Sequence, residues 1–383
     1  MGLDEFLNQL PEDDDASVNY ASLPELSNLT GPEAEEFGQL WLEWSSERVL
    51  EIVDRMVALC EEQPDVEFEA IYKQGLLHPS VPVRLSALRG LEESGDRALI
   101  KPLSNMLLTD PSVEVRAASA IPLTYLSAMA QEKKVRSKDG VVLSRLLYGV
   151  LDDEREVQAV KLKALEAVSV FGGDRLAPYI ESAASSSDIS ALKSSLFAMG
   201  RACDPRWITS VLPHLEHDVA SIRYEAAMAM GELGDEEHLR ALEVPLDDAD
   251  LTVQLAAISA VERIGGEVAK GLLELLLVSP EPRVVELAQQ ALQTMKDEED
   301  LDEVVTQEMA RSMFGAGDTL PGVDTEGYES AEIEGWANLP DPSEVDDFGT
   351  GVTEEAEELG LDRGDPFDID LMPEDPWDHE ENF

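Results

Sequence analysis

The sequence predicts an all-α fold, an α-solenoid of about seven helical-hairpin repeats with disordered acidic termini. A sequence segment recurs with a constant period in the second half of the chain. The equivalent helical position in successive repeats is occupied by Leu192, Arg223, Gln254 and Val285. A glycine-aspartate pair marks the junctions between repeats with the same period. Because each repeat buries its apolar face against its neighbours, such a chain presents a long surface, and catalysis needs separate evidence.

Residues 1–66 precede the repeats. Residues 1–39 contain ten acids, no Lys or Arg and only short apolar clusters, so we expect a flexible acidic lead. From Trp41 to Cys60 the apolar side chains follow with helical spacing, which predicts one amphipathic helix within residues 40–66. The end of a repeat array needs its open face covered, and this helix is expected to cap it.

The repeats occupy residues 67–296, and each is expected to be two helices joined by a short turn. In the second repeat, Asp110-Pro111 is the turn, and Asp110 is expected to accept hydrogen bonds at the start of the next helix. Gly234 and its equivalents are expected to end helices in the left-handed conformation. The repeats are expected near 67–95, 96–130, 141–173, 174–203, 204–234, 235–265 and 266–296.

An insertion follows the second repeat. Residues 131–140 hold the basic cluster of the chain, made by Lys133, Lys134, Arg136 and Lys138. A solvated loop is one interpretation. The other is a docking site for the chain's own acidic tail, because opposite charges attract within a Debye length of ~8–10 Å.

The C-terminal segment 297–383 is the most acidic part of the chain, with thirty acids against Arg311 and Arg363. This composition predicts a largely disordered tail. Isolated aromatic residues in such segments are typical anchors for binding a partner, although the tail could also serve only to keep the chain in solution. The candidate anchors are Trp336, Phe348, Phe367 and Trp377.

Charge limits the class of partner. With 81 acidic and 28 basic residues, the net charge of -53 repels nucleic acids and anionic membranes, and it favours basic proteins. The longest apolar run, from Gly271 to Val278, is interrupted by Glu274, so no membrane span is expected. The N-terminus has no export signal, and Cys60 and Cys203 suit a reducing compartment, so a cytoplasmic location is expected.

The turn followed by Val-Arg, as in the segment from Asp110 to Arg116, together with the Gly-Asp junctions, resembles HEAT repeats of the short bacterial kind often called bilin-lyase-like. The resemblance covers about residues 67–296. It implies the solenoid fold but little about function, because proteins with these repeats include scaffolds, bilin lyases, hydroxylases and glycosylases.

In that family the repeat aspartates and arginines look structural and form a ladder between neighbouring repeats. The resemblance therefore implies that later positions without arginine, Leu192, Gln254 and Val285, interrupt the ladder. The residues expected to form it are Arg84, Asp110, Arg116 and Arg223.

The sequence offers little for catalysis. Deoxyhypusine hydroxylases of this fold would need several His-Glu steps to hold iron, and the chain has one, His379-Glu380. His214 and His217 are a close pair that exposed turn residues explain more simply than a metal. No catalytic, cofactor-binding or metal-binding residue is therefore predicted.

The sequence therefore predicts a non-catalytic scaffold for protein-protein interaction, which holds a partner on the inner surface lined by the second helix of each repeat and uses the acidic tail as a second arm. The alternative is a bilin lyase-like or other enzyme of the same fold. A visible absorbance band after co-expression with bilin synthesis would identify a bilin lyase.

Overall fold

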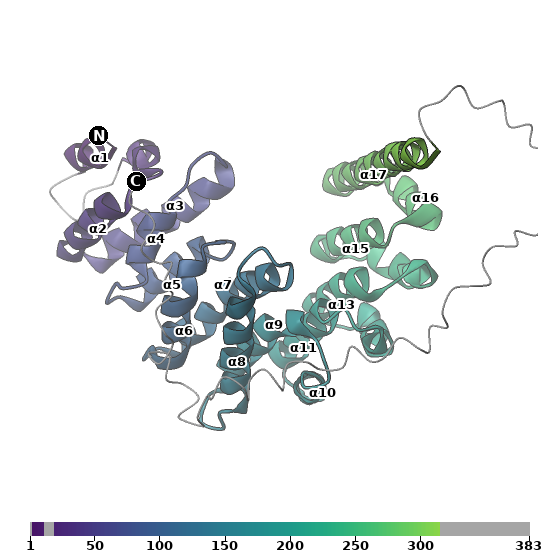
Figure 1. Cartoon of the computed structure of the whole chain (residues 1–383), viewed down its shortest axis with the longest axis horizontal. Helices are drawn as coiled ribbons and strands as arrows, with labels where there is room; N and C mark the ends of the chain where they lie inside the picture. The colour runs from purple at the N-terminus through teal and green to yellow at the C-terminus, as the bar shows by residue number, and fades with distance from the viewer. Residues whose placement is uncertain (1, 11–18, 315–383) are drawn as a thin grey trace, which may run out of the picture. The chain divides into compact units, whose positions relative to one another are not determined.

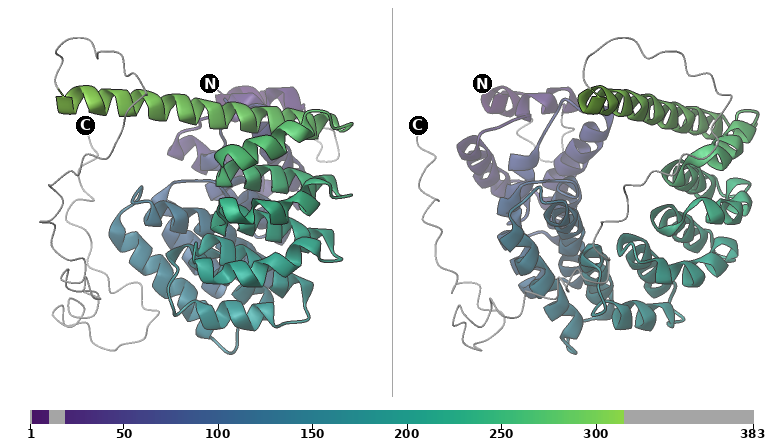
Figure 2. Two further views of the ribbon diagram at one scale, coloured as in Figure 1. Left: turned by 90° about the vertical axis from the view of Figure 1, so that its right-hand side faces the viewer. Right: turned by 45° about the vertical axis from the view of Figure 1, so that its right-hand side comes forward.

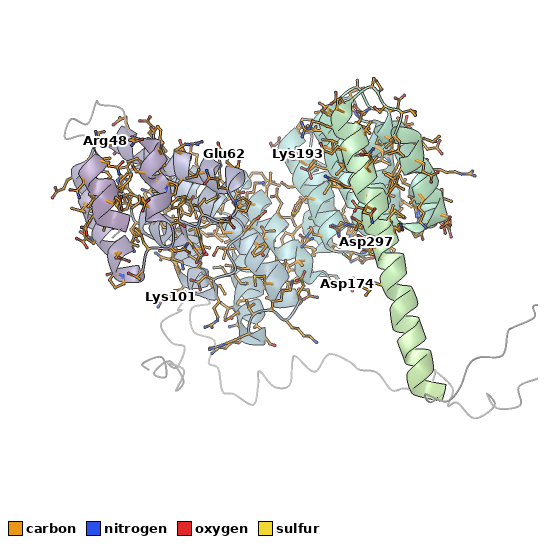
Figure 3. The ribbon with its side chains drawn as sticks, turned by 90° about the horizontal axis from the view of Figure 1, so that it is seen from above. Arg48, Glu62, Lys101, Asp174, Lys193 and Asp297 are labelled. Carbon is orange, nitrogen blue, oxygen red and sulfur yellow. The ribbon has the colours of Figure 1, made fainter. Side chains whose placement is uncertain are left out.

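The computed structural model of this chain describes residues 2–10 and 19–314. The chain divides into two units, Met1–Asp297 and Glu298–Phe383, and the fold described here is that of the first. Asp297 lies within the last helix (Figure 3). The candidate anchors of the predicted tail lie outside the described residues.

The described residues are helical, with no β-strand among them, and the first unit is an α-solenoid, which confirms the predicted fold class (Figures 1 and 2). The second helices of the repeats form one layer, in which each helix from α3 to α15 contacts the next. They are α3 (Ser46–Glu62), α5 (Val81–Gly90), α7 (Val113–Gln131), α9 (Gln158–Val168), α11 (Ile189–Arg201), α13 (Ala220–Leu233), α15 (Leu251–Ile264) and α17 (Pro282–Phe314).

The first helices of the repeats form the other layer, and each from α4 to α14 contacts the second helix that follows it. They are α2 (Gly31–Leu40), α4 (Glu69–Gly75), α6 (Ile100–Thr109), α8 (Ser137–Asp152), α10 (Ala177–Ala184), α12 (Ile208–Val211) with η6 (Leu212–Glu216), η7 (Glu236–Leu242) with α14 (Glu243–Leu246), and α16 (Gly266–Leu276). The remaining short helices are α1 (Gly2–Gln9), η1 (Tyr20–Leu26), η2 (Trp41–Glu43), η3 (Arg97–Leu99), η4 (Ser169–Phe171) and η5 (Pro205–Trp207).

The described part of the N-terminal lead is folded, which corrects the expectation of a flexible segment. Phe6 of α1 and Phe37 of α2 are fully buried, and their ring centroids lie 6.0 Å apart, edge to face. Leu23 and Leu26 of η1 are also fully buried. Each short apolar cluster therefore contributes to a shared core, which composition alone does not reveal because no cluster could be buried by itself.

The predicted capping helix is interrupted. The structure has η2 and then α3, which starts after Ser45, whose Oγ accepts a hydrogen bond from the backbone nitrogen of Arg48 at 3.3 Å. Because α2 contacts α4 and α3 contacts α5, α2 and α3 add one more pair to the two layers. Trp41 is buried and its ring meets that of His78 edge-on, which joins this pair to the first predicted repeat.

The insertion mostly lengthens helices, which corrects the expected loop at residues 131–140. Helix α7 has 19 residues and α8 has 16, against 10 in each of α5 and α6. Only residues 132–136 join α7 to α8. Asp139 in the first turn of α8 is buried and accepts two hydrogen bonds from Arg97, at 3.1 and 3.2 Å, so part of the predicted basic loop is fixed to the preceding repeat.

Two glycines at equivalent positions of neighbouring repeats set the separation of the later second helices. A Cβ atom on Gly200 would lie 2.9 Å from the Cα atom of Ala229, and one on Gly231 would lie 2.8 Å from the Cα atom of Ala260. The backbones of α11, α13 and α15 thus approach as closely as absent and methyl side chains allow. One hydrophobic cluster runs through the unit from Leu3 to Met295.

The glycine at the end of α13 has a different role from the one expected. Gly234 has a φ of −76°, outside the left-handed region, but a Cβ atom there would lie 2.6 Å from the carbonyl oxygen of Met230. Glycine is therefore required at this junction for close approach. Gly265, at the end of α15, does take the left-handed conformation, with a φ of 73°.

Candidate interaction surface

Arg84 connects the turn of its own repeat to the turn of the next. Its Nη1 donates a hydrogen bond to the carbonyl oxygen of His78 at 2.9 Å, and its Nη2 donates to Oδ1 of Asp110 at 3.0 Å. The side chains of Arg84 and Asp110 are only 10% and 8% exposed. Since a charge at this depth needs a partner, each side chain depends on the other.

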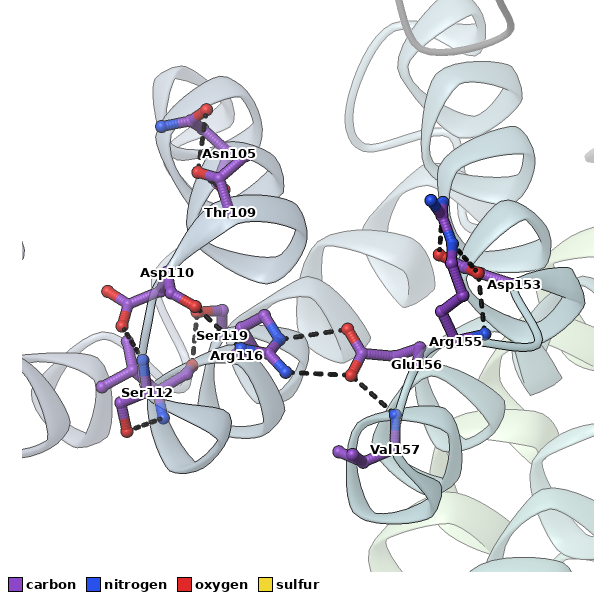
Figure 4. A network of polar contacts seen from close by, with 11 residues as sticks. Asn105, Thr109, Asp110, Ser112, Arg116, Ser119, Asp153, Arg155, Glu156 and Val157 are labelled. Carbon is purple, nitrogen blue, oxygen red and sulfur yellow. Dashed lines mark hydrogen bonds and ion pairs between the residues drawn. The ribbon is translucent and has the colours of Figure 1, made fainter.

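Arg116 makes the equivalent contacts one repeat later (Figure 4). Its Nη1 donates to the carbonyl oxygen of Asp110 at 2.8 Å, and its Nε and Nη2 each lie 3.0 Å from an oxygen of Glu156. The hydrogen bond to Glu156 raises the pKa of the Arg116 guanidinium. Asp110 thus serves both arginines, through its carboxylate for Arg84 and its carbonyl for Arg116.

Arg223 repeats the arrangement in the later part of the unit. It donates to the carbonyl oxygen of His217 at 2.8 Å and to both carboxylate oxygens of Asp248, at 2.5 and 2.7 Å. The hydrogen bond from Arg223 lowers the pKa of Asp248. At the equivalent position of α11, Leu192 is buried and has no side-chain donor.

The turn at Asp110 differs in detail from the prediction. Asp110 is the C-cap of α6, and its Oδ1 accepts a hydrogen bond from the backbone nitrogen of Ser112 at 2.9 Å. Ser112 is the N-cap of α7, and its Oγ accepts from the nitrogen of Val115 at 3.4 Å. Pro111 therefore lies before the cap and outside the first helical turn, where its missing amide costs nothing.

A pocket of ≈ 240 Å³ lies between α11 and α13, on the face that the first helices leave uncovered. Phe197, Tyr224 and Met228 supply its apolar walls. Its floor is the close approach of Gly200 to Ala229 described above. The sequence signal for this pocket is the repeat period itself, because Phe197 and Met228 are separated by one full period and are therefore equivalent in neighbouring repeats.

Charged side chains line the pocket at both ends. At one end, Glu232 of α13 lies 3.6 Å from Nη1 of Arg201 and 3.0 Å from Nη1 of Arg263, so one carboxylate joins three second helices. At the other end, Glu225 lies 3.7 Å from Nζ of Lys193, which Figure 3 labels on α11. Burial raises the pKa of Glu225, and the Lys193 ammonium opposes that rise.

A third contact extends this row of charges to α9. Glu166 accepts a hydrogen bond from Oγ of Ser194 at 2.5 Å and lies 2.6 Å from Nζ of Lys163. Its carboxylate is near enough to Glu225 to raise the pKa of that residue further. Helices α9, α11, α13 and α15 are therefore linked by side-chain charges across one surface.

The remaining candidates do not converge on a site. Ring centroids of His214 and His217 lie 6.0 Å apart at the end of η6, and burial lowers the pKa of His214. Within the described residues, no group of three or more His, Cys, Asp or Glu side chains is placed to hold a metal ion. No described helix combines the length and the apolar character needed to cross a membrane.

Comparison with protein families matches residues 208–293 to HEAT repeats. This segment includes α13, α15 and the pocket residues of α13, so the repeat type inferred from the turn and Val-Arg pattern holds there. The bilin-lyase-like subtype stays a prediction. A comparison with curated proteins finds no match.

Several solved structures are similar to this chain. An engineered protein is 18% identical and matches over 77% of this chain and 88% of its own, with a TM-score of 0.35. Human deoxyhypusine hydroxylase in complex with glycerol is 16% identical over 70% and 97%, with a TM-score of 0.32. A designed armadillo repeat protein in complex with the peptide (KR)4 is 20% identical over 58% and 98%, with a TM-score of 0.29. At such low identities and TM-scores, these likenesses do not bear on function.

Proposed function

We propose that this chain is a non-catalytic scaffold that holds a protein partner on the layer of second helices. The observation that carries the proposal is the pocket between α11 and α13. Its walls leave large apolar side chains accessible, with Tyr224 37% exposed, inside a rim of charged groups. An apolar pocket surrounded by polar groups is the arrangement that receives an anchoring side chain in protein interfaces.

The packing around the pocket supports this function. The backbones of α11 and α13 cannot move closer, because Gly200 already lies against Ala229. The carboxylate of Glu232 also ties α13 to Arg201 and Arg263 on its two neighbours. A surface held in one shape loses little entropy when a partner binds, which favours affinity.

The acidic tail is proposed as a second arm. Its support is the sequence, in which Trp336, Phe348, Phe367 and Trp377 are spaced among the acids of residues 297–383. A strong negative charge accelerates encounter with a basic protein, so the tail is proposed to contact basic partners. The free thiols of Cys60 and Cys203 support a reducing, cytoplasmic setting.

The test is affinity purification of the tagged full-length chain from its native cell, followed by peptide identification. The double variant Tyr224→Ala with Met228→Ala removes two walls of the pocket, and we expect about tenfold less of at least one partner, since anchoring pockets dominate binding energy. Tyr125→Ala is the control, because Tyr125 is an exposed tyrosine of α7 that does not line the pocket. Equal recovery with all three chains would contradict the proposal.

The tail is tested separately in the same experiment. Replacing Trp336, Phe348, Phe367 and Trp377 together by alanine leaves the acids in place. If the aromatics anchor a partner, we expect a distinct set of proteins to be lost. An unchanged set would support the alternative, a tail that only keeps the chain in solution.

A further inference from the structure

We propose that the pocket between α11 and α13 binds an acidic peptide segment of a partner protein and takes up one large apolar side chain of that segment. The inference rests on the proposed function and specifies the chemistry of the partner. It differs from the expectation drawn from the net charge of -53, which favours basic proteins for the chain as a whole.

At one end of the pocket, the carboxylate is buried more deeply than the two guanidinium groups that contact it. The side chain of Glu232 is only 16% exposed, whereas those of Arg201 and Arg263, on either side of it, are 33% and 57% exposed. The carboxylate lies below the surface and orients two guanidinium groups above it. A ligand that approaches these ion pairs therefore meets the two guanidinium groups before the carboxylate of Glu232.

At the other end of the pocket, the cations are again more exposed than the carboxylates they contact. Glu225 is 16% exposed beneath Lys193 at 39%, and Glu166 is 14% exposed beside Lys163 at 39%. The three carboxylates are thus recessed, and the four cationic groups face solvent. Because these cations are already held by buried partners, they can bind carboxylates of a peptide without a large loss of side-chain entropy.

The apolar walls of the pocket require that the peptide also carry a large apolar side chain. Phe197, Tyr224 and Met228 enclose ≈ 240 Å³ between the two charged ends. A water molecule takes ~30 Å³ in the liquid, so the pocket holds several waters that make few hydrogen bonds to such walls. An apolar side chain that displaces them gains the hydrophobic free energy of its own burial and that of the walls.

The strong negative charge of the whole chain does not prevent an acidic peptide from binding at the pocket. At physiological ionic strength, exposed charges farther away than a Debye length of ~8 Å are largely screened, so the near cations decide the interaction at the pocket. A basic segment would instead meet the cation of each ion pair before the more deeply buried carboxylate of that pair, which is unfavourable.

Fluorescence anisotropy of a labelled synthetic peptide with the full-length chain tests the proposal. The probe has one tryptophan with three Asp or Glu residues on each side. One control peptide replaces the tryptophan by alanine, and a second replaces every acid by lysine. We expect the probe to bind at least about tenfold more tightly than either control, and more weakly as salt is raised.

Chain variants locate the binding. Arg201→Gln with Arg263→Gln is expected to weaken the probe about tenfold, since two charge-assisted contacts are lost. Arg155→Gln with Arg175→Gln is the matched control, because it also removes two arginines that are paired with carboxylates, neither of which lines the pocket, and it should leave affinity within about twofold. Tyr224→Ser keeps every charge and should still weaken the probe several-fold.

Circular dichroism establishes that each variant is folded, and Tyr224→Ser keeps the test valid if the double arginine variant is not. The proposal is overturned if the lysine peptide binds as well as the probe, or if folded pocket variants bind the probe like the wild type. Loss of a cellular partner in the Tyr224→Ala, Met228→Ala chain together with failure of the probe would reject this inference and leave the scaffold function standing.

Discussion

The early and late repeats of this solenoid are joined in different ways. From α5 to α9 the turns are connected by a continuous run of side-chain bonds, from Arg84 to Asp110 and from Arg116 to Glu156. From α11 to α15 the run is broken at Leu192 and is present again only at Arg223, which bonds Asp248. In this part the backbones also approach closely, at Gly200 and Gly231. Repeats of the same sequence period therefore fix the distance between neighbouring helices in two ways, by arginine-carboxylate bonds and by close backbone approach at glycine.

The difference matters for function because the pocket between α11 and α13 lies at one of these close approaches, that of Gly200 to Ala229. Where Gly200 lies against Ala229, the larger side chains Phe197, Tyr224 and Met228 form the walls around the gap. The arginines of the turns lie deep, with Arg84 only 10% exposed, whereas Arg201 and Arg263 beside the pocket are 33% and 57% exposed.

The largest effect is expected from Arg84→Leu. The change leaves the carboxylate of Asp110, 8% exposed, without its guanidinium partner, and we expect a loss of about 3 kcal/mol in the free energy of unfolding. Urea titration followed by circular dichroism measures it. Arg55→Leu is the control, since the Arg55–Glu62 pair is exposed and its loss should leave the midpoint unchanged. Equal midpoints for both variants would mean that the turn contacts do not stabilise the early repeats.

Gly231→Ala tests the close backbone approach between α13 and α15. The new Cβ atom would lie 2.8 Å from the Cα atom of Ala260, so α13 and α15 must separate, at a cost of about 2 kcal/mol. Gly271→Ala in α16 meets no atom within 4 Å and should be neutral or stabilising by about 0.5 kcal/mol. A thermal melt of both chains distinguishes steric separation from a general effect of glycine in a helix, which would move both in one direction.

Asp248→Asn tests whether the late contact of Arg223 acts as the early ones do. We expect a loss of about 1 kcal/mol at neutral pH, from a charge-assisted hydrogen bond to a side chain that is 6% exposed. Because Arg223 lowers the pKa of Asp248 below 3.8, its contribution is present above that pH and disappears as the pH falls through the lowered pKa. The difference between the two chains should therefore shrink in acid unfolding measurements, and a constant difference would assign the effect to packing.

Glu225→Gln should give the smallest change, in the opposite direction. Burial, and then the nearby Glu166, raise the pKa of Glu225, so its ionised form destabilises the fold at neutral pH. The amide should add about 0.5 kcal/mol at pH 7, and the gain should disappear as the pH falls and the wild-type carboxylate takes up a proton. A gain that persists in acid would contradict this origin. The same variant should bind the acidic probe slightly more tightly than the wild type.

Periodicity made the solenoid predictable, because a repeat of constant length fixes which positions of each second helix face the core. The positions of Arg84, Arg116 and Arg223 followed from the same alignment. The N-terminal helices could not be found in this way. Phe6, Leu23 and Phe37 lie outside the repeats that the sequence period predicts, and all three are buried in the shared core.

The pocket was also beyond a sequence argument based on single positions. It depends on a difference between side chains at equivalent places, since Phe197 and Met228 are large where the next repeat has Ser259. It depends equally on the depth of Glu225 and Glu232, which composition counts only as further negative charge. The net charge of the sequence therefore predicts a basic partner, whereas the burial of these carboxylates beneath exposed cations favours an acidic one at the pocket.

Leu192 also has a mechanical consequence. Two turns bridged by a guanidinium and a carboxylate separate only when several directional bonds rupture together, whereas apolar surfaces can slip past one another gradually. Under tension applied to the ends of the solenoid, the turns on either side of Leu192, which lack such a bridge, should therefore separate before the turns bridged by Arg84, Arg116 and Arg223.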